Sequence, residues 1–432
     1  MVATLRRWGI GLLSVFAMGA AGLYGEAPDW PQFRGPGGTG KCSETGLLKS
    51  WPASGPKLLW KIEGLGRGYS TLSIAAGKFY TMGDRKTDDG ESQFVLAYDL
   101  ASRKELWARR IGPPHGGGGP RCTPTVDGDR VYAIGTDGDL VCLKTQDGEV
   151  VWQKNFVKDF GGAMMSGWRY SESPLVDGDR LVCTPGGKEA TLAALDKKSG
   201  DVLWKCAVPD LGPRGKDGAG YSTMVAADID GVRQYVQIIG RGAVGVDAKT
   251  GKFLWGYNRI ANGVANIPTP VVRGNHVFVT TSYETGSALL KIVKDGDDVK
   301  AEEVYFHTPQ EFENHHGGVI LVDDHLYGGS GRNNGTPVCL DFASGKIAWR
   351  GKPAGNRSAA IVYADGNLIF RYEDGTVALI EANAKKYTLK GKFKAAVVEG
   401  EAWPYPVVHD GKLYLRAHNT LMCYDLRGNS AD

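Results

Sequence analysis

One phrase recurs along this chain and restricts its fold more than any other feature. An apolar run ends in Asp, a Gly follows in all but the first copy, and an apolar pair ends in Trp eight residues after the Asp. The copies run from Asp99 to Trp107, Asp196 to Trp204, Asp247 to Trp255 and Asp341 to Trp349, with a variant from Lys144 to Trp152. Successive Trp residues are 45, 52, 51 and 94 residues apart, and the last interval equals two steps of 47. A period of this size is typical of folds built from repeated small sheets.

A second marker, a tight turn between two alternating strands, runs out of phase with the first. Asp-Gly between alternating apolar residues is the strongest local signal for a hairpin. The eight turns lie at 76–77, 127–128, 177–178, 230–231, 273–274, 323–324, 365–366 and 410–411. Each repeat therefore reads as an inner strand, a turn, two further strands, a Gly turn and an outer strand that carries Trp. That is the size and order of a four-stranded propeller blade.

Two repeats are degraded and one is split between the ends of the chain. The fifth has Tyr305, and the seventh has Tyr387 and Phe393, where the others have Trp. The eighth stops where its outer strand should begin, while residues 57–62 form an outer strand with its own Trp60 and no blade before it. Pairing these two ends would close the ring and remove an open sheet edge. We therefore predict an all-β fold, an eight-bladed β-propeller of four-stranded antiparallel blades over residues 57–427, closed by an N-terminal outer strand.

The repeated Trp residues are best explained as packing between neighbouring blades. A large indole buried between sheets needs an acceptor for its N–H group. We expect this structural role for the residues Trp60, Trp107, Trp152, Trp204, Trp255 and Trp349.

The N-terminus predicts export. Arg6 and Arg7 precede an uncharged stretch of residues 8–25 that is rich in Gly and Ala, which is typical of a cleaved signal peptide over residues 1–25. An uncleaved anchor is the alternative. Residues 26–56 then form a lead-in, residues 428–432 a tail, and the mature chain has no membrane span. The seven Cys residues show no framework of paired spacings and are expected to be mostly buried thiols.

The charge of the chain does not indicate a particular class of partner. The net charge is +3 and no run of Lys or Arg exceeds two residues, so nucleic acid is not an expected partner.

The repeat resembles a known family. Asp247-Ala-Lys-Thr-Gly-Lys-Phe-Leu-Trp255 is similar to the tryptophan-docking repeat of eight-bladed PQQ-like (quinoprotein-like) propellers. That family includes pyrroloquinoline quinone (PQQ) dehydrogenases and the BamB-like outer-membrane protein assembly propellers. The phrase Asp29-Trp-Pro-Gln-Phe-Arg-Gly-Pro36 is similar to the lead-in of secreted PQQ-like repeat proteins. The resemblance implies the fold, and fold alone does not imply an activity.

A binding site is predicted at one mouth of the central channel, where the residues just before the inner strands gather. Convergent aromatic and polar groups around a concavity suit a small ligand or a peptide segment. The alternative is a channel mouth that only bonds itself and water. The candidates are Arg67, Tyr69, Arg121, Trp168, Arg169, Glu172, Tyr221, Asn266, His315, His316, Arg357 and Trp403.

Two functions follow from different uses of this mouth. The first is a non-catalytic binding or scaffold module, monomeric and periplasmic or extracellular, for an envelope protein or a small ligand, with no cofactor and no metal. The second is a PQQ-dependent dehydrogenase of alcohols or sugars. The resemblance implies for it a Ca²⁺ site, for which Glu172, Asn266, Arg357 and Trp403 are suitable residue types. The chain has no Cys-Cys pair and no CxxCH haem motif, and His315-His316, adjacent on an extended chain, are poorly placed to bind one metal together.

Overall fold

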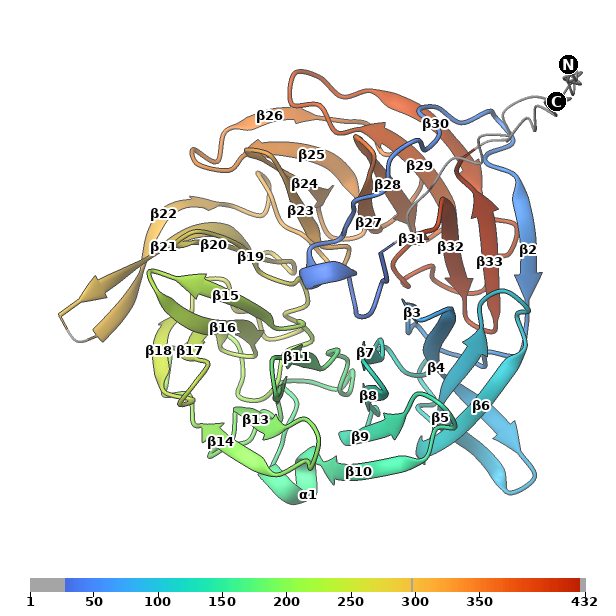
Figure 1. Ribbon diagram of the computed structural model, residues 1–432. Coiled ribbons are helices and arrows are strands. Elements are labelled where there is room, and N and C mark those ends of the chain that lie inside the picture. Colours follow the sequence, from blue (N-terminus) through green and yellow to red (C-terminus); the bar gives the residue numbers. More distant parts are fainter. Residues whose placement is uncertain (1–27, 297, 428–432) are drawn as a thin grey trace, which may run out of the picture.

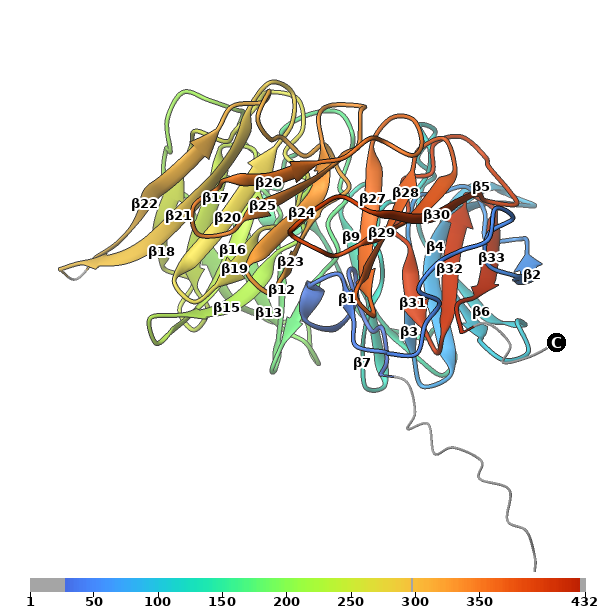
Figure 2. The ribbon, with the colours of Figure 1, turned by 90° about the horizontal axis from the view of Figure 1, so that it is seen from above.

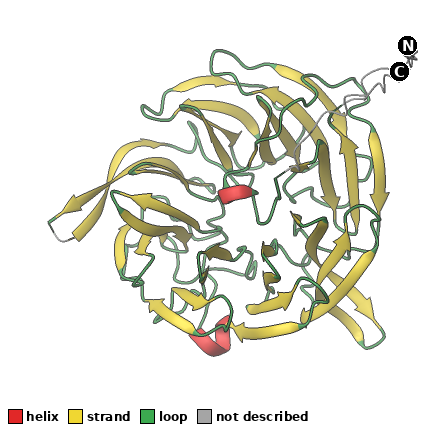
Figure 3. Cartoon of the chain, viewed as in Figure 1, coloured by secondary structure: helices red, strands yellow, loops and turns green. Residues whose placement is uncertain are grey.

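The structure is a computed structural model that describes residues 28–296 and 298–427. The predicted signal peptide and the C-terminal tail lie outside the described residues. Within the described part, the chain forms eight sheets arranged radially around a central channel, which confirms the predicted propeller (Figure 1). Helix is confined there to η1 (Pro36–Gly38) at the centre and α1 (Phe156–Phe160) at the rim (Figure 3).

Seven blades are continuous in sequence, and their strands run antiparallel from the channel outwards. The first four blades consist of β3 (Ser73–Ala75), β4 (Lys78–Thr87), β5 (Gly90–Asp99) and β6 (Glu105–Gly112); β7 (Thr125–Asp127), β8 (Arg130–Ile134), β9 (Asp139–Lys144) and β10 (Val150–Asn155); β11 (Leu175–Asp177), β12 (Arg180–Cys183), β13 (Leu192–Asp196) and β14 (Val202–Cys206); and β15 (Val225–Ile229), β16 (Val232–Ile239), β17 (Gly242–Asp247) and β18 (Phe253–Tyr257).

The remaining blades complete the ring. They consist of β19 (Val271–Arg273), β20 (His276–Thr281), β21 (Gly286–Asp295) and β22 (Asp298–His307); β23 (Val319–Val322), β24 (His325–Ser330), β25 (Thr336–Asp341) and β26 (Ile347–Arg350); β27 (Ala359–Ala364), β28 (Asn367–Tyr372), β29 (Thr376–Glu381) and β30 (Leu389–Lys394); and β31 (Val407–His409), β32 (Lys412–Ala417), β33 (Thr420–Asp425) and β2 (Leu58–Ile62).

The eighth blade closes the ring as predicted. The N-terminal strand β2 pairs antiparallel with β33, with Trp60 opposite Cys423. This pairing joins strands from the two ends of the chain, so the ring has no open edge at the junction. Figure 2 shows the ring edge-on, with the long β21–β22 hairpin projecting from the rim.

The Trp side chains of the repeat connect neighbouring blades. The indole of Trp107 donates to the Thr145 carbonyl of the next blade (3.2 Å), and its ring lies where a Cβ on Gly148 would be only 2.6 Å away. The same arrangement links Trp152 to the third blade and Trp204 to the fourth. Gly148, Gly200 and Gly251 are thus both left-handed turn residues and the seats for the Trp rings of the preceding blades.

The degraded fifth blade changes the partner of one Trp. The fifth blade lacks the Gly phrase, and Trp255 instead donates to Gln234 of its own blade (2.9 Å). Tyr305 then replaces Trp as the docking residue of the fifth blade, because its hydroxyl donates to the Phe342 carbonyl (3.0 Å) and its ring covers Gly345.

The lead-in runs across the channel, a feature that the sequence did not predict. Trp30 forms a bridge with Ile74 of the first blade, and the strand β1 (Lys41–Cys42) adds to the inner edge of β27 in parallel. Between them, Arg34 is buried and donates to the Val319 carbonyl of the sixth blade (2.6 Å). The lead-in, with η1, therefore lies at the centre of the ring in Figure 1.

The seven Cys residues are all buried free thiols. Among the described residues, no helix has the length and apolar character that a membrane crossing requires.

Candidate functional site

The segments that lead into the inner strands place side chains in two tiers around the channel. Side chains on an extended chain alternate between faces, so residues two apart point the same way. Tyr69 and Thr71 of the first blade both face the channel, and so do Arg121 and Thr123 of the second. The residues between them, Ser70 and Cys122, are fully buried between the blades.

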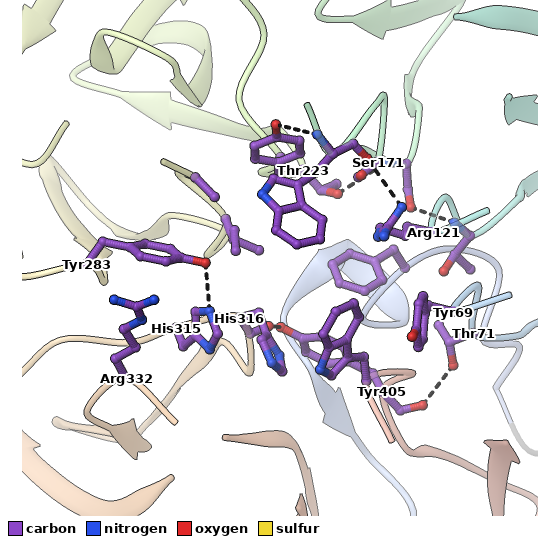
Figure 4. A pocket seen from close by; sticks show the side chains of 18 of the residues that line it. Tyr69, Thr71, Arg121, Ser171, Thr223, Tyr283, His315, His316, Arg332 and Tyr405 are labelled. Atoms are coloured by element: carbon purple, nitrogen blue, oxygen red, sulfur yellow. Dashed lines mark hydrogen bonds between the residues drawn. The ribbon is translucent and has the colours of Figure 1, made fainter. Parts of the chain in front are cut away.

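These tiers form a pocket, here called the cup, of about 320 Å³ at the channel mouth (Figure 4). This volume lies at the lower end of the range for small-molecule sites. Phe33 of the lead-in lines the cup and packs edge-on against Tyr405, with ring centres 4.8 Å apart. The remaining aromatic lining residues are Tyr69, Trp168, Tyr221, Tyr283 and Trp403.

Arg121 lies beside a pair of these rings, Tyr69 and Trp403, whose centres are 4.4 Å apart. Its guanidinium carbon is 5.5 Å from the centre of the Tyr69 ring and 5.9 Å from that of Trp403, within the range of cation–π attraction. Its Nη1 donates to the Trp168 carbonyl (3.2 Å). Burial lowers the pKa of Arg121, although a guanidinium stays protonated in proteins.

The opposite wall holds a histidine pair and a buried acid. His315 bonds the Tyr283 hydroxyl through Nε2 (2.9 Å) and the Ser358 hydroxyl through Nδ1 (2.8 Å). Burial, and then the neighbouring His316, lower the pKa of His315 to about 3, so this ring is neutral near pH 7. His316 Nε2 bonds Glu373 Oε1 (2.9 Å). Burial is the largest single effect on Glu373 and opposes its ionisation, but this bond and the other neighbouring groups together keep the pKa of Glu373 below its usual value.

His315, His316 and Glu373 are the described residues whose ligand atoms come close enough to hold a metal ion, within 4.8 Å of one another. Both ring nitrogens of His315 already have hydroxyl partners, so a metal would have to displace one of them. The cluster is therefore a hydrogen-bonded wall of the cup.

Seven of the twelve candidate residues line the cup: Tyr69, Arg121, Trp168, Tyr221, His315, His316 and Trp403. Arg357 lies beside it, with Nη1 3.8 Å from both Glu373 and Glu401. Arg67 faces a neighbouring groove and pairs with Glu91 (3.1 Å), and the half-exposed Arg169 pairs with Asp137 (3.0 Å).

Glu172 and Asn266 point away from the cup. Each is the middle residue of its segment, so its side chain turns between the blades while its neighbours Ser171 and Ala265 face the channel. Glu172 accepts from the Thr184 N–H (2.6 Å) and from Gln237 Nε2 (3.0 Å), and burial raises its pKa to about 7. Asn266 donates to the carbonyls of Ile239 (3.0 Å) and Gly240 (3.2 Å).

The residues suggested for PQQ and Ca²⁺ therefore do not fit that group. The oxygens of Glu172 and Asn266 that would bind Ca²⁺ are buried and already accept hydrogen bonds within the protein. Of the four residues, Trp403 lines the cup and Arg357 lies beside it.

Three further residues line the cup but were not among the candidates predicted from the sequence. Tyr283 and Arg332 come from the turns after the second strands of the fifth and sixth blades, in polar stretches between apolar strands. Phe33 belongs to the lead-in phrase at residues 29–36. Arg332 lies over the Tyr283 ring, 4.7 Å from its centre (Figure 4).

Repeat, ring and cup together define the class of eight-bladed propellers with PQQ-like docking repeats. Comparison with known proteins then places the chain more closely. Residues 91–351, more than half of the chain, match the family described as outer membrane protein assembly factor BamB, and the chain belongs to that family.

Individual relatives are distant. The outer membrane protein assembly factor BamB of Alteromonas naphthalenivorans is 24% identical over 282 residues, which are 61% of this chain and 62% of that protein. BamB of Kangiella koreensis is 25% identical over 199 residues, 44% of each chain. The matches to curated relatives thus span less than two thirds of those proteins.

Solved structures share the fold. BamB from Moraxella catarrhalis is 14% identical with a TM-score of 0.60, over 87% of this chain and 99% of that one. A quinohemoprotein alcohol dehydrogenase from Comamonas testosteroni is 12% identical with a TM-score of 0.62, over 94% and 81%. Because an outer membrane protein assembly factor and an alcohol dehydrogenase resemble the chain equally well, fold likeness does not choose between their functions.

Proposed function

We propose that this chain is an exported, non-catalytic binding protein of the cell envelope. Its cup would take a small ligand or a short segment of an envelope protein. The observation that carries the proposal is the cup itself, a concavity of about 320 Å³ with aromatic walls and a few polar groups at the mouth of a rigid ring. The BamB relatives support a partner among the proteins of outer-membrane assembly.

The arrangement of polar groups favours binding over catalysis. The cup is lined by no Asp or Glu among the described residues, so no carboxylate base faces its interior. His315 is held by two hydroxyls, and His316 is held by Glu373, which is itself buried. These contacts fix the walls of the cup, as a rigid binding site requires.

The oxidoreductase alternative rests on fold likeness alone, and a direct test separates the two functions. PQQ and Ca²⁺ are added to the purified protein, and bound-quinone absorbance and dye reduction with alcohols and sugars are measured. The proposal expects no dye reduction and no dependence of quinone binding on Ca²⁺, because the buried Glu172 and Asn266 cannot ligate Ca²⁺ without breaking blade contacts. Saturable PQQ binding with substrate-dependent dye reduction would overturn the proposal.

The binding function is tested by replacing the exposed rim residue Trp168, which is 47% exposed and so is not needed for packing. Trp168→Ala should reduce recovery of a bound ligand or envelope partner with the purified protein, without lowering the melting temperature. The matched control is Leu59→Ala, a residue 40% exposed on the outer strand β2. Equal loss in both variants would contradict a role for the cup.

A further inference from the structure

One wall of the cup carries hydrogen-bonding groups that the protein leaves unused. Among the described residues, Arg121 Nη2 and Thr123 Oγ1 are buried atoms with no hydrogen-bond partner. Both residues line the cup, and Thr123 is fully buried. Buried polar groups are nearly always bonded, and an exception calls for an explanation.

The two unbonded groups lie on the same short segment of the chain. Arg121 and Thr123 are two residues apart on the segment entering β7, so their side chains lie on the same side of it. The backbone N–H of Thr123 is already satisfied by Ser173 Oγ (2.9 Å), so the hydroxyl is the group left over. A guanidinium and a hydroxyl on the same face of one segment can both donate to an oxyanion.

The charge around this pair also favours an anion. Within residues 28–296 and 298–427, no carboxylate forms an ion pair with Arg121 or Arg332, although both line the cup. The acids around the cup are engaged elsewhere: Glu373 bonds His316, and Glu401 accepts from the Tyr69 hydroxyl (3.0 Å). Asp84, whose charge raises the pKa of Arg121, accepts from Gln93 Nε2 (3.1 Å) and from the His115 N–H (2.8 Å). The cup thus has two arginines without acidic partners and a lining free of acids.

The other lining residues determine which shape of ligand the cup can accept. Tyr69, Trp403 and Trp168 border the Arg121 wall, and aromatic faces favour flat bodies, either aromatic or the apolar face of a sugar ring. A volume of about 320 Å³ leaves room for one such body with one charged group.

We propose that the Arg121–Thr123 wall is a carboxylate subsite, and that the ligand of the cup joins a carboxylate to a flat ring-shaped body. The ligand oxygens would accept from Arg121 Nη2 and Thr123 Oγ1 after a small turn of the guanidinium towards the cup. This inference rests on the proposed binding function and specifies its ligand class.

Matched acids and neutral analogues test the subsite. Phenylacetate is compared with phenylacetamide, and glucuronate with glucose, by saturation-transfer NMR with the full mature chain. Each acid should bind at least about tenfold more tightly than its neutral partner, because the neutral analogue leaves the charged donor without an anion. A preference for phenylacetate indicates an aromatic body, and a preference for glucuronate indicates a sugar; either result supports the subsite.

Two variants assign the effect to this wall. Arg121→Gln should abolish the preference for the acid, and Thr123→Val, which keeps the shape of the side chain, should reduce it severalfold with an unchanged melting temperature. The control Arg67→Gln removes an arginine that faces the neighbouring groove and should leave the preference intact. Equal binding of acid and neutral analogue in the wild type, or a preference that survives Arg121→Gln, overturns the subsite.

The same data separate this inference from the proposed function. If neutral rings bind in the cup as tightly as the matched acids and Trp168→Ala weakens both, the carboxylate subsite fails while the binding function stands. If neither acids nor neutral rings bind at millimolar concentration and Trp168→Ala changes no partner, both fail.

Discussion

Replacing Gly251 with Ala tests whether the blades are joined by Trp rings seated on glycines. Gly251 has φ +75°, and a Cβ there would lie 2.6 Å from the Trp204 ring. Gly77 provides a matched control, because its φ is +71° and no heavy atom lies within 4 Å of the added Cβ. Both substitutions strain the backbone equally, and only one meets the ring of a neighbouring blade.

The expected losses of stability follow from the backbone strain, which both variants share, and from the contact with the Trp204 ring, which only Gly251→Ala makes. A left-handed conformation costs an alanine about 1–2 kcal/mol, which is the whole expected loss of stability for Gly77→Ala. Gly251→Ala adds overpacking against a buried ring, about 1–3 kcal/mol more. In the background of Trp204→Ala the ring is absent, so Gly251→Ala should then cost no more than Gly77→Ala.

Urea unfolding followed by far-ultraviolet circular dichroism measures these differences as shifts of the free energy of unfolding. The result that would refute the reasoning is equal destabilisation by Gly251→Ala and Gly77→Ala. An additive effect of Gly251→Ala and Trp204→Ala would refute it as well, because two residues in contact should be coupled.

Three further predictions follow. Trp204→Ala should lower the free energy of unfolding by about 3–5 kcal/mol, as expected for a buried aromatic ring, whereas Trp168→Ala at the exposed rim should change it by less than about 1 kcal/mol in the same urea titration. The pKa of Glu172 is raised to about 7 by burial, so the folded state binds its proton more tightly than the unfolded state does; stability should therefore fall as the pH rises from about 4.5 to 7, and Glu172→Gln should flatten this part of the pH profile measured by thermal melting. All seven Cys residues are buried free thiols, so a thiol reagent should react slowly with the native protein and titrate seven thiols in denaturant, and fewer than seven in denaturant without reductant would show a disulfide.

The ring could be predicted from the sequence because its determinants are local and periodic. The turn at 127–128 and the Trp152 phrase each recur about once per blade, and Trp107, Trp152 and Trp204 bond the next blade in the same way. Even the degraded fifth blade follows the pattern, since Tyr305 docks against the next blade at the position where other blades have Trp. Strand order within a blade follows from hairpin turns, which need no long-range information.

The lining of the cup could be predicted only in part, because the direction of a side chain on an extended segment changes from one residue to the next. Ser171 and Glu172 are neighbours in one short segment, yet Ser171 faces the cup and Glu172 is buried between blades. An error of one residue on an extended chain turns a side chain to the opposite face. The acidic type of Glu172 suggested a ligand, whereas its structural role depends on Gln237, 65 residues away.

The lead-in could not be placed because its contacts are remote in sequence. Arg34 bonds a carbonyl 285 residues further along the chain, and Phe33 reaches the cup from a segment without repeats. No periodicity links this segment to the channel that it crosses, so its composition indicated only an irregular stretch before the first strand.

Site-specific photo-crosslinking tests most directly whether the cup is where this propeller binds. A photo-reactive phenylalanine analogue replaces Trp168 at the cup rim or, as the comparison, Leu59 on the outer strand; both positions are exposed. After irradiation of cells that export the protein, mass spectrometry detects an adduct of either a polypeptide or a small molecule. The account predicts a defined adduct at position 168 that Arg121→Gln diminishes, and none at position 59. An adduct at position 59 with none at position 168 would contradict it.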